Sequence, residues 1–203
     1  MKSALFIASL SLFATLPAAA LVERGKEGNL TEFVRPVPGE RVCFSRAYGT
    51  QHLAKHPRQT VSAIAFYLTY FQHEPDVHYP EGQRNHYYRL SVSFRDRPGE
   101  TFKALGDCHP GKGSISCTVE CDGGGVRVQW RKKPDSILID FADMYGIRLS
   151  VCGGDEQDEE EEASAETENE REPEAMVLTR GEDDKSFLLT RAKDAECPEY
   201  EKW

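Results

Sequence analysis

Alternating apolar and polar residues form the dominant pattern in the middle of this chain. The clearest run covers residues 88–94, in which every second side chain is apolar, and a second run covers residues 126–131. Side chains along a β-strand point alternately to opposite faces, so each run predicts a strand with one apolar and one polar face. The pattern therefore indicates a sheet that covers a core with one of its sides.

Shorter apolar runs, separated by glycine- and proline-containing turn signals, predict further strands. They cover residues 41–46, 61–71, 101–105, 114–121, 136–141, 147–152, 175–179 and 186–190. The clearest helical segment is residues 50–56, with Thr50 as its N-cap and Pro57 as its stop. We therefore predict an all-β fold with one short helix: a small antiparallel β-barrel or closed sandwich of about 8–10 strands, because closure removes exposed edges.

The segment 61–71 differs from the others because both of its faces are apolar. One face carries Ile64, Phe66, Leu68 and Tyr70, and the other carries Val61, Ala63, Ala65, Tyr67 and Phe71. We expect the second face to be covered by the N-terminal segment or by the helix that starts at Thr50. A partner or dimer surface is the alternative.

The N-terminal 20 residues have the composition of a secretory signal peptide. Lys2 supplies the positive charge, residues 4–16 are largely apolar, and Pro17 precedes three alanines that end at Ala20. The apolar run is too short for a membrane anchor, and no later segment is apolar enough to span a bilayer. We expect cleavage after Ala20 and a soluble product that is secreted or periplasmic.

Six cysteines follow this segment, and an even number in an oxidising compartment predicts three disulfides. Cys117 and Cys121 lie four apart on a predicted strand, about 13 Å from each other, so they are not expected to pair. No CxxC motif indicates structural zinc. The predicted disulfide cysteines are Cys43, Cys108, Cys117, Cys121, Cys152 and Cys197.

Most of the formal charge of −9 comes from one segment. Residues 155–174 contain 12 acidic side chains and one basic side chain, without an aromatic or β-branched aliphatic residue. Such a segment cannot offset its ordering entropy by burial, so we expect a disordered loop inserted into a single domain formed by residues 21–154 and 175–203. Its charge could attract cations or basic proteins, and it argues against nucleic acid as a partner.

His52 and His56 are the candidate metal ligands. They stand four apart in the predicted helix, so both imidazoles would share one face. A third ligand could come from the polar loop that follows the long strand, which contains His73, Glu74, Asp76 and His78. The pair lacks the glutamate of HExxH, and no GxSxG or dinucleotide-binding motif occurs in the chain, so we do not expect catalysis.

A signal peptide, a single all-β domain and a few disulfides together resemble the architecture of lipocalin-like secreted barrels. This resemblance implies a ligand inside the barrel, where Tyr88, Phe94 and Trp130 are the candidate lining residues. We expect an exported, non-catalytic binding protein of the cell envelope or medium, which holds a small apolar ligand in the barrel or a protein partner on its surface. The alternative is an envelope metal-binding protein or metal-dependent enzyme that uses zinc at the loop of His52 and His56.

Overall fold

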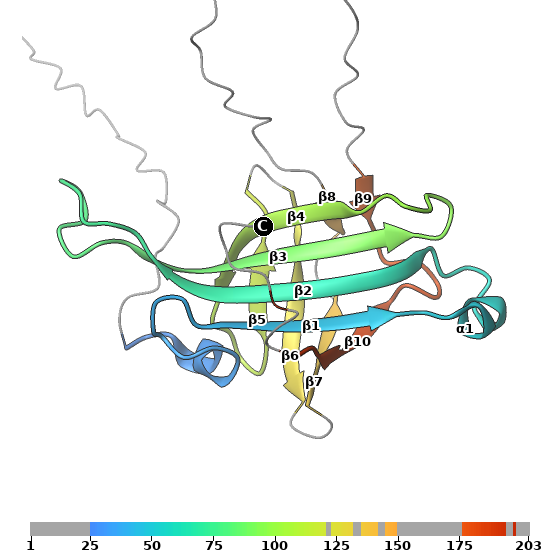
Figure 1. Ribbon diagram of the computed structural model, residues 1–203, viewed down its shortest axis with the longest axis horizontal. Helices are drawn as coiled ribbons and strands as arrows, with labels where there is room; N and C mark the ends of the chain where they lie inside the picture. The colour runs from blue at the N-terminus through green and yellow to red at the C-terminus, as the bar shows by residue number, and fades with distance from the viewer. Residues whose placement is uncertain are drawn as a thin grey trace, which may run out of the picture.

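The computed structural model describes residues 25–120, 123–131, 135–141, 145–149 and 176–193, together with Cys197 (Figure 1). The predicted signal peptide, the predicted acidic loop, Cys121 and Cys152 lie outside these residues. The described elements, in chain order, are η1 (Gly28–Glu32), β1 (Arg41–Ala47), α1 (Thr50–Lys55), β2 (Val61–Gln72), β3 (Arg84–Phe94), β4 (Phe102–His109), β5 (Ile115–Thr118), β6 (Gly125–Arg131), β7 (Ser136–Asp140), β8 (Ile147–Leu149), β9 (Met176–Leu178) and β10 (Ser186–Arg191).

Eight strands form a closed antiparallel barrel in the order β1-β10-β7-β6-β5-β4-β3-β2. The prediction of a small all-β barrel is confirmed, and the alternative of a sandwich is wrong. Neighbours along the chain are neighbours in space, except that β8 and β9 pair as a separate two-stranded sheet between β7 and β10. Two of the ten predicted strands therefore lie outside the barrel.

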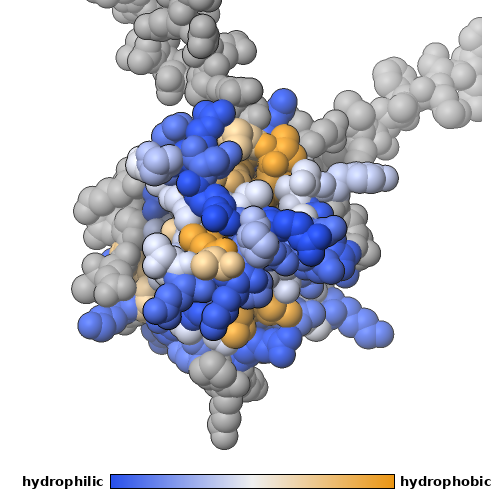
Figure 2. All heavy atoms as spheres, turned by 90° about the vertical axis from the view of Figure 1, so that its right-hand side faces the viewer, coloured by the Kyte–Doolittle hydropathy of each residue, from blue (hydrophilic) through white to orange (hydrophobic). Residues whose placement is uncertain are grey.

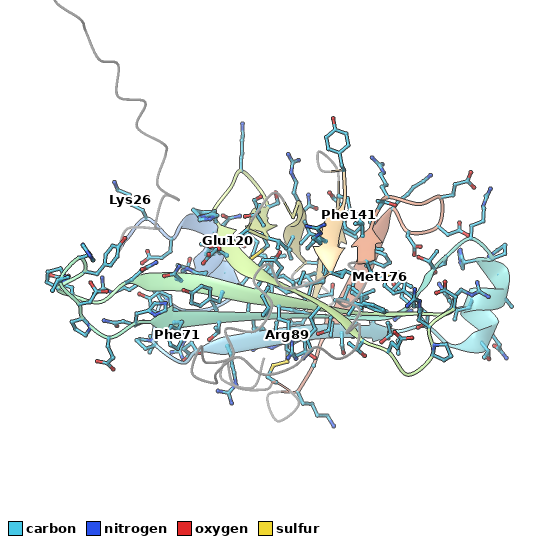
Figure 3. The ribbon with its side chains drawn as sticks, turned by 90° about the horizontal axis from the view of Figure 1, so that it is seen from above. Lys26, Phe71, Arg89, Glu120, Phe141 and Met176 are labelled. Carbon is cyan, nitrogen blue, oxygen red and sulfur yellow. A yellow bond between two sulfur atoms is a disulfide. The ribbon has the colours of Figure 1, made fainter. Side chains whose placement is uncertain are left out.

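The alternation in β3 places the even-numbered side chains from His86 to Phe94 in the barrel interior. Leu90 pairs with Phe66 on β2 and Ala104 on β4, and all three are fully buried. The same face of β6 carries Val126 and Val128, which are also fully buried. The apolar faces predicted from the sequence therefore converge on one core (Figure 3).

Some strand and helix limits differ from those predicted. The predicted strand 114–121 ends at Thr118, because the backbone then turns and the N–H of Val119 bonds to the carbonyl of Gly124. Strand β4 continues to His109, four residues beyond its predicted end. Thr50 is the first residue of α1, and Gly49 is the N-cap, so the predicted cap was one residue too late.

The second face of β2 is partly covered by a side chain from the neighbouring strand β3. Figure 1 places η1 and α1 at opposite ends of the barrel, so neither lies across this face as we predicted. A register shift between Val61 and Ala63 leaves Val61 fully buried in the core rather than on the outer face. The guanidinium of Arg89 lies 4.1 Å from the ring centroid of Tyr67 and covers it. Figure 3 shows Arg89 and Phe71 across the barrel from Phe141 and Met176.

Two disulfides join described residues. Cys43–Cys197 links β1 to the C-terminal part of the chain over 154 residues, and Cys108–Cys117 joins directly paired positions of β4 and β5. Four of the six predicted cysteines are thus oxidised, and Cys117 does not pair with Cys121. Within the described part of the chain, no helix is long and apolar enough to cross a membrane.

We predict that the remaining two cysteines, Cys121 and Cys152, form the third disulfide. The neighbouring described residues support this pairing, because Gly124 bridges Ile147 in antiparallel fashion and Arg148 N–H donates to Gly123 O at 2.7 Å. Peptide mapping without reductant should recover a peptide that contains both cysteines. A reduced thiol in the denatured protein, or a link from either cysteine to Cys43, would contradict the prediction.

Candidate functional site

One end of the barrel is covered by η1. Leu30 is fully buried, and the ring of Phe33 meets Trp130 edge to face at a centroid distance of 5.4 Å. The backbone N–H of Gly111, in the β4–β5 turn, donates to Asn29 Oδ1 at 3.0 Å. Leu30 of η1 and its C-cap residue Phe33 therefore pack against this end, and Asn29 joins η1 to the β4–β5 turn.

The opposite end, beside α1, contains a groove of about 290 Å³. Figure 2 looks at this end and shows apolar patches within a mostly hydrophilic surface. The groove reaches Phe187, which is only 1% exposed and belongs to the inner wall of β10. It is lined by Arg46, Tyr48, His52, His56, Gln59, Asp183, Ser186, Phe187 and Leu188.

The candidate metal ligands both lie in this groove, where their rings are stacked. The imidazole centroids of His52 and His56 are 4.4 Å apart, and the Tyr48 ring continues the stack at 4.8 Å from His52. Gln59 Nε2 donates to the carbonyl of Val61, so Gln59 Oε1 accepts from His52 Nε2 at 3.0 Å. This hydrogen bond occupies Nε2, one of the two ring nitrogens through which His52 could bind a metal.

The other ligands considered from the sequence lie far from this pair. His73, Glu74, Asp76 and His78 follow the C-terminal end of β2, whereas His56 precedes its N-terminal end. The 12 residues of β2 separate the two loops by roughly 35–40 Å at about 3.3 Å per residue. No group of three potential metal ligands occurs among the residues that the structure describes.

We expect the wild-type protein to bind no stoichiometric zinc. Two stacked imidazoles, one of them hydrogen-bonded to Gln59, do not direct their lone pairs at a common point. Calorimetry with zinc chloride on protein purified without a chelator or a polyhistidine tag measures this. Tight one-to-one binding that disappears in the double variant His52→Ala, His56→Ala would contradict the expectation.

Asp183 and Asp184 lie in the β9–β10 turn, and Asp183 lines the groove. Asp184 is 1% exposed, and its Oδ2 accepts hydrogen bonds from the N–H and the hydroxyl of Thr60, both at 2.7 Å. Asp183 Oδ2 accepts from the N–H of Arg58 at 3.2 Å. The two aspartates therefore fasten this turn to the segment that precedes β2.

The three predicted ligand-lining residues belong to the interior but lie at different heights. Phe94 is near the α1 end, where its ring meets Phe102 at 5.6 Å, whereas Trp130 is near the η1 end. Tyr88 lies between them, fully buried, and stacks on Phe66 at a centroid distance of 5.9 Å. The structure therefore places Tyr88 and Phe94 in the core and Trp130 partly buried against it, without gathering the three into one cluster.

Two buried polar atoms on the inner face of β3 have no hydrogen-bond partner among the described residues. They are the Tyr88 hydroxyl and His86 Nε2, and their residues are 0% and 2% exposed. An unsatisfied polar atom in a protein interior costs about 1–3 kcal/mol. These side chains stand two apart on one strand, so they face the same interior.

Both groups are uncharged at neutral pH. Burial lowers the pKa of the His86 imidazole to about 4; Glu27 opposes this shift and His109 adds to it. Burial, reinforced by the charge of Asp107, raises the pKa of the Tyr88 phenol far above its ordinary range. Around His86 and Tyr88, the barrel interior therefore contains uncharged hydrogen-bonding groups with apolar neighbours.

The lowered pKa predicts that His86 makes stability fall in acid. Between pH 6.5 and pH 4 the unfolded state binds a proton at this histidine and the folded state does not. Stability is therefore fully present above pH 6.5 and falls by up to about 3 kcal/mol as the pH drops through this window. In urea unfolding at several pH values, His86→Gln should show a flatter dependence, whereas the exposed control His78→Gln should match the wild type. Parallel pH profiles for His86→Gln and wild type would contradict this.

Sequence reasoning missed three residues that matter here. The alternation in β3 extends two residues upstream of Tyr88 to His86, and this continued period was the available signal. Gly106 lies within β4 directly opposite Tyr88, and an isolated glycine in a strand indicates a close approach. No local signal marks Asp184 as buried, because its partner Thr60 is 124 positions away.

Comparisons of this chain with protein-family models, with curated proteins and with solved structures find no match.

Proposed function

We propose that this protein is a non-catalytic binding protein that holds one small, mainly apolar ligand inside its barrel. The observation that carries the proposal is a difference between the grooves at the two ends. A groove of about 400 Å³ near the η1 end is lined by residues 37–41, Arg191 and Cys197, and none of these belongs to the hydrophobic core. Leu30 of η1 and its C-cap residue Phe33 pack against the core at that end, while a groove of about 290 Å³ leads from the surface to the inner-wall residue Phe187 at the other. Ligand sites of small barrels lie in such mouths and the interior behind them.

The character of the interior supports an apolar ligand. Its walls carry Leu68, Leu90 and Val92, which are fully buried, and β4 contributes the small side chain of Ala104 beside them. Burial of apolar surface gives about 25 cal/mol per Å², so a ligand with a short hydrocarbon chain can bind without a charged contact.

Saturable binding of a neutral apolar probe tests the proposal. We expect N-phenyl-1-naphthylamine to bind one-to-one with a rise in fluorescence and to raise the melting temperature. Ala104→Leu narrows the interior and should weaken this binding at least fivefold, whereas Lys103→Leu, one residue away on the exposed face, should not. Circular dichroism confirms that both variants fold. Absence of saturable binding to the wild type, or equal affinities of the two variants, would contradict the proposal.

Export is part of the proposal. The two disulfides support an oxidising compartment, because such bonds are rare where glutathione keeps thiols reduced. Mass spectrometry of the exported protein should give a chain that starts at or near Leu21. A mature chain that retains Met1 would contradict export through cleavage.

A further inference from the structure

We propose that the ligand is a neutral amphiphile, with a hydroxyl or carbonyl group bound by Tyr88 and His86, and that a carboxylate ligand is rejected. The inference rests on the proposed function, because it names the ligand class of the same interior.

Tyr88 and His86 place two polar atoms at one level of the barrel interior, where the neighbouring side chains are apolar. Tyr88 and His86 project from one face of β3, and neighbouring inward positions on β2 and β3 carry Leu68 and Leu90. The Tyr88 hydroxyl can donate and accept, and His86 Nε2 can do either according to its tautomer. A hydroxyl or carbonyl oxygen at this height would pair with atoms that have no partner among the described residues.

The charge near His86 favours a ligand whose buried polar group is uncharged. The charged group that acts most strongly on His86 is the carboxylate of Glu27, which is only 6% exposed. A buried ligand carboxylate would therefore meet a like charge and two neutral partners. Burial of a charge costs several kcal/mol unless it is paired, so an anion should bind much more weakly than the corresponding alcohol.

The same contacts set the orientation of the ligand. On β3, His86 and Tyr88 lie toward the end covered by η1, and Phe94 lies toward the groove beside α1. The separation between Tyr88 and Phe94 is roughly 20 Å along the strand, at about 3.3 Å per residue. The polar end of the ligand therefore enters first, and its hydrocarbon chain extends toward the groove.

Tyr88→Phe separates this role from a structural one. The substitution keeps the ring and removes a buried hydroxyl that has no partner in the described structure. The unliganded variant should therefore be more stable, with a melting temperature about 2–4 °C higher. Its affinity for 1-decanol should fall about fivefold to tenfold, because one hydrogen bond is lost.

The experiment measures 1-decanol and decanoate binding at pH 8, where decanoate is ionised, in wild type, Tyr88→Phe and the control Tyr79→Phe. Tyr79 lies in the β2–β3 loop and is 39% exposed. We expect decanoate to bind at least tenfold more weakly than 1-decanol to the wild type, and Tyr79→Phe to behave as the wild type.

Two kinds of outcome would overturn the inference, and only one of them also overturns the proposed binding function. If 1-decanol binds but decanoate binds equally well, or if Tyr88→Phe binds 1-decanol as tightly as the wild type, the ligand class is wrong and the binding function survives. If neither 1-decanol nor N-phenyl-1-naphthylamine binds the wild type, the proposed function fails and the inference fails with it.

Discussion

Removal of the Cys43–Cys197 disulfide should lower the free energy of unfolding by about 5 kcal/mol. The bond closes 154 residues, and the loop-entropy model gives about 4.7 kcal/mol for a loop of 100 residues and more for a longer one. It also lies beside the barrel seam, where β1 and β10 pair at two positions, compared with seven between β1 and β2. Loss of the link should therefore loosen the closure that defines the barrel.

Urea unfolding of the exported double variant Cys43→Ala, Cys197→Ala measures this effect. The matched comparison is Cys108→Ala, Cys117→Ala, which removes a link across nine residues and should lose only about 2–3 kcal/mol through loop entropy. A loss below about 2 kcal/mol for the long link would show that the seam is held by other contacts.

Gly106→Ala should destabilise the barrel by about 4 kcal/mol or more. A Cβ atom at this position would lie 2.0 Å from the backbone oxygen of Thr118 and 3.2 Å from Cε1 of Tyr88. Because the first contact is with backbone, β4 and β5 must move apart to accept the methyl group.

The matched control is Gly49→Ala. This N-cap residue has a φ of −70°, and a Cβ there meets nothing within 4 Å. Its stability should change by less than about 1 kcal/mol. Thermal unfolding of both variants measures the difference, and we expect a much lower melting temperature for Gly106→Ala than for Gly49→Ala. Equal melting temperatures would contradict the close approach of β4 and β5 at Gly106.

Local patterns predicted the strands but not what brings them together. Alternation at Tyr88, Leu90 and Val92 identified the inner face of β3, because the period of two is a property of the strand itself. The pairing of Cys43 with Cys197 depends on where distant segments meet, and six cysteines allow 15 connectivities. The separation of β8 and β9 from the barrel is equally non-local.

Like the fold, the candidate site could be predicted only in part: the sequence indicated single residues but not which of them lie together. Tyr88 was identified as an inward aromatic, but the missing partner of its hydroxyl depends on side chains from neighbouring strands. His52 was correctly placed in the helix, but His56 lies at its C-cap, one residue beyond the helix end. The distance from this pair to His73 and His78 depends on the direction of β2. Residue type and spacing indicated candidates, and the topology determined which of them could act together.

The most direct test of ligand binding in the barrel is the location of a bound probe. Nuclear Overhauser effects between ¹³C-labelled 1-decanol and the assigned protein should reach the Leu90 and Val92 methyl groups, which are fully buried on the inner face of β3. We expect the carbon next to the hydroxyl to contact the Tyr88 ring and the terminal methyl to contact Val92, which lies roughly 13 Å further along β3, within reach of an extended ten-carbon chain. Contacts confined to exposed side chains such as Val77 and Val37, with none to the inner face of β3, would contradict a ligand inside the barrel.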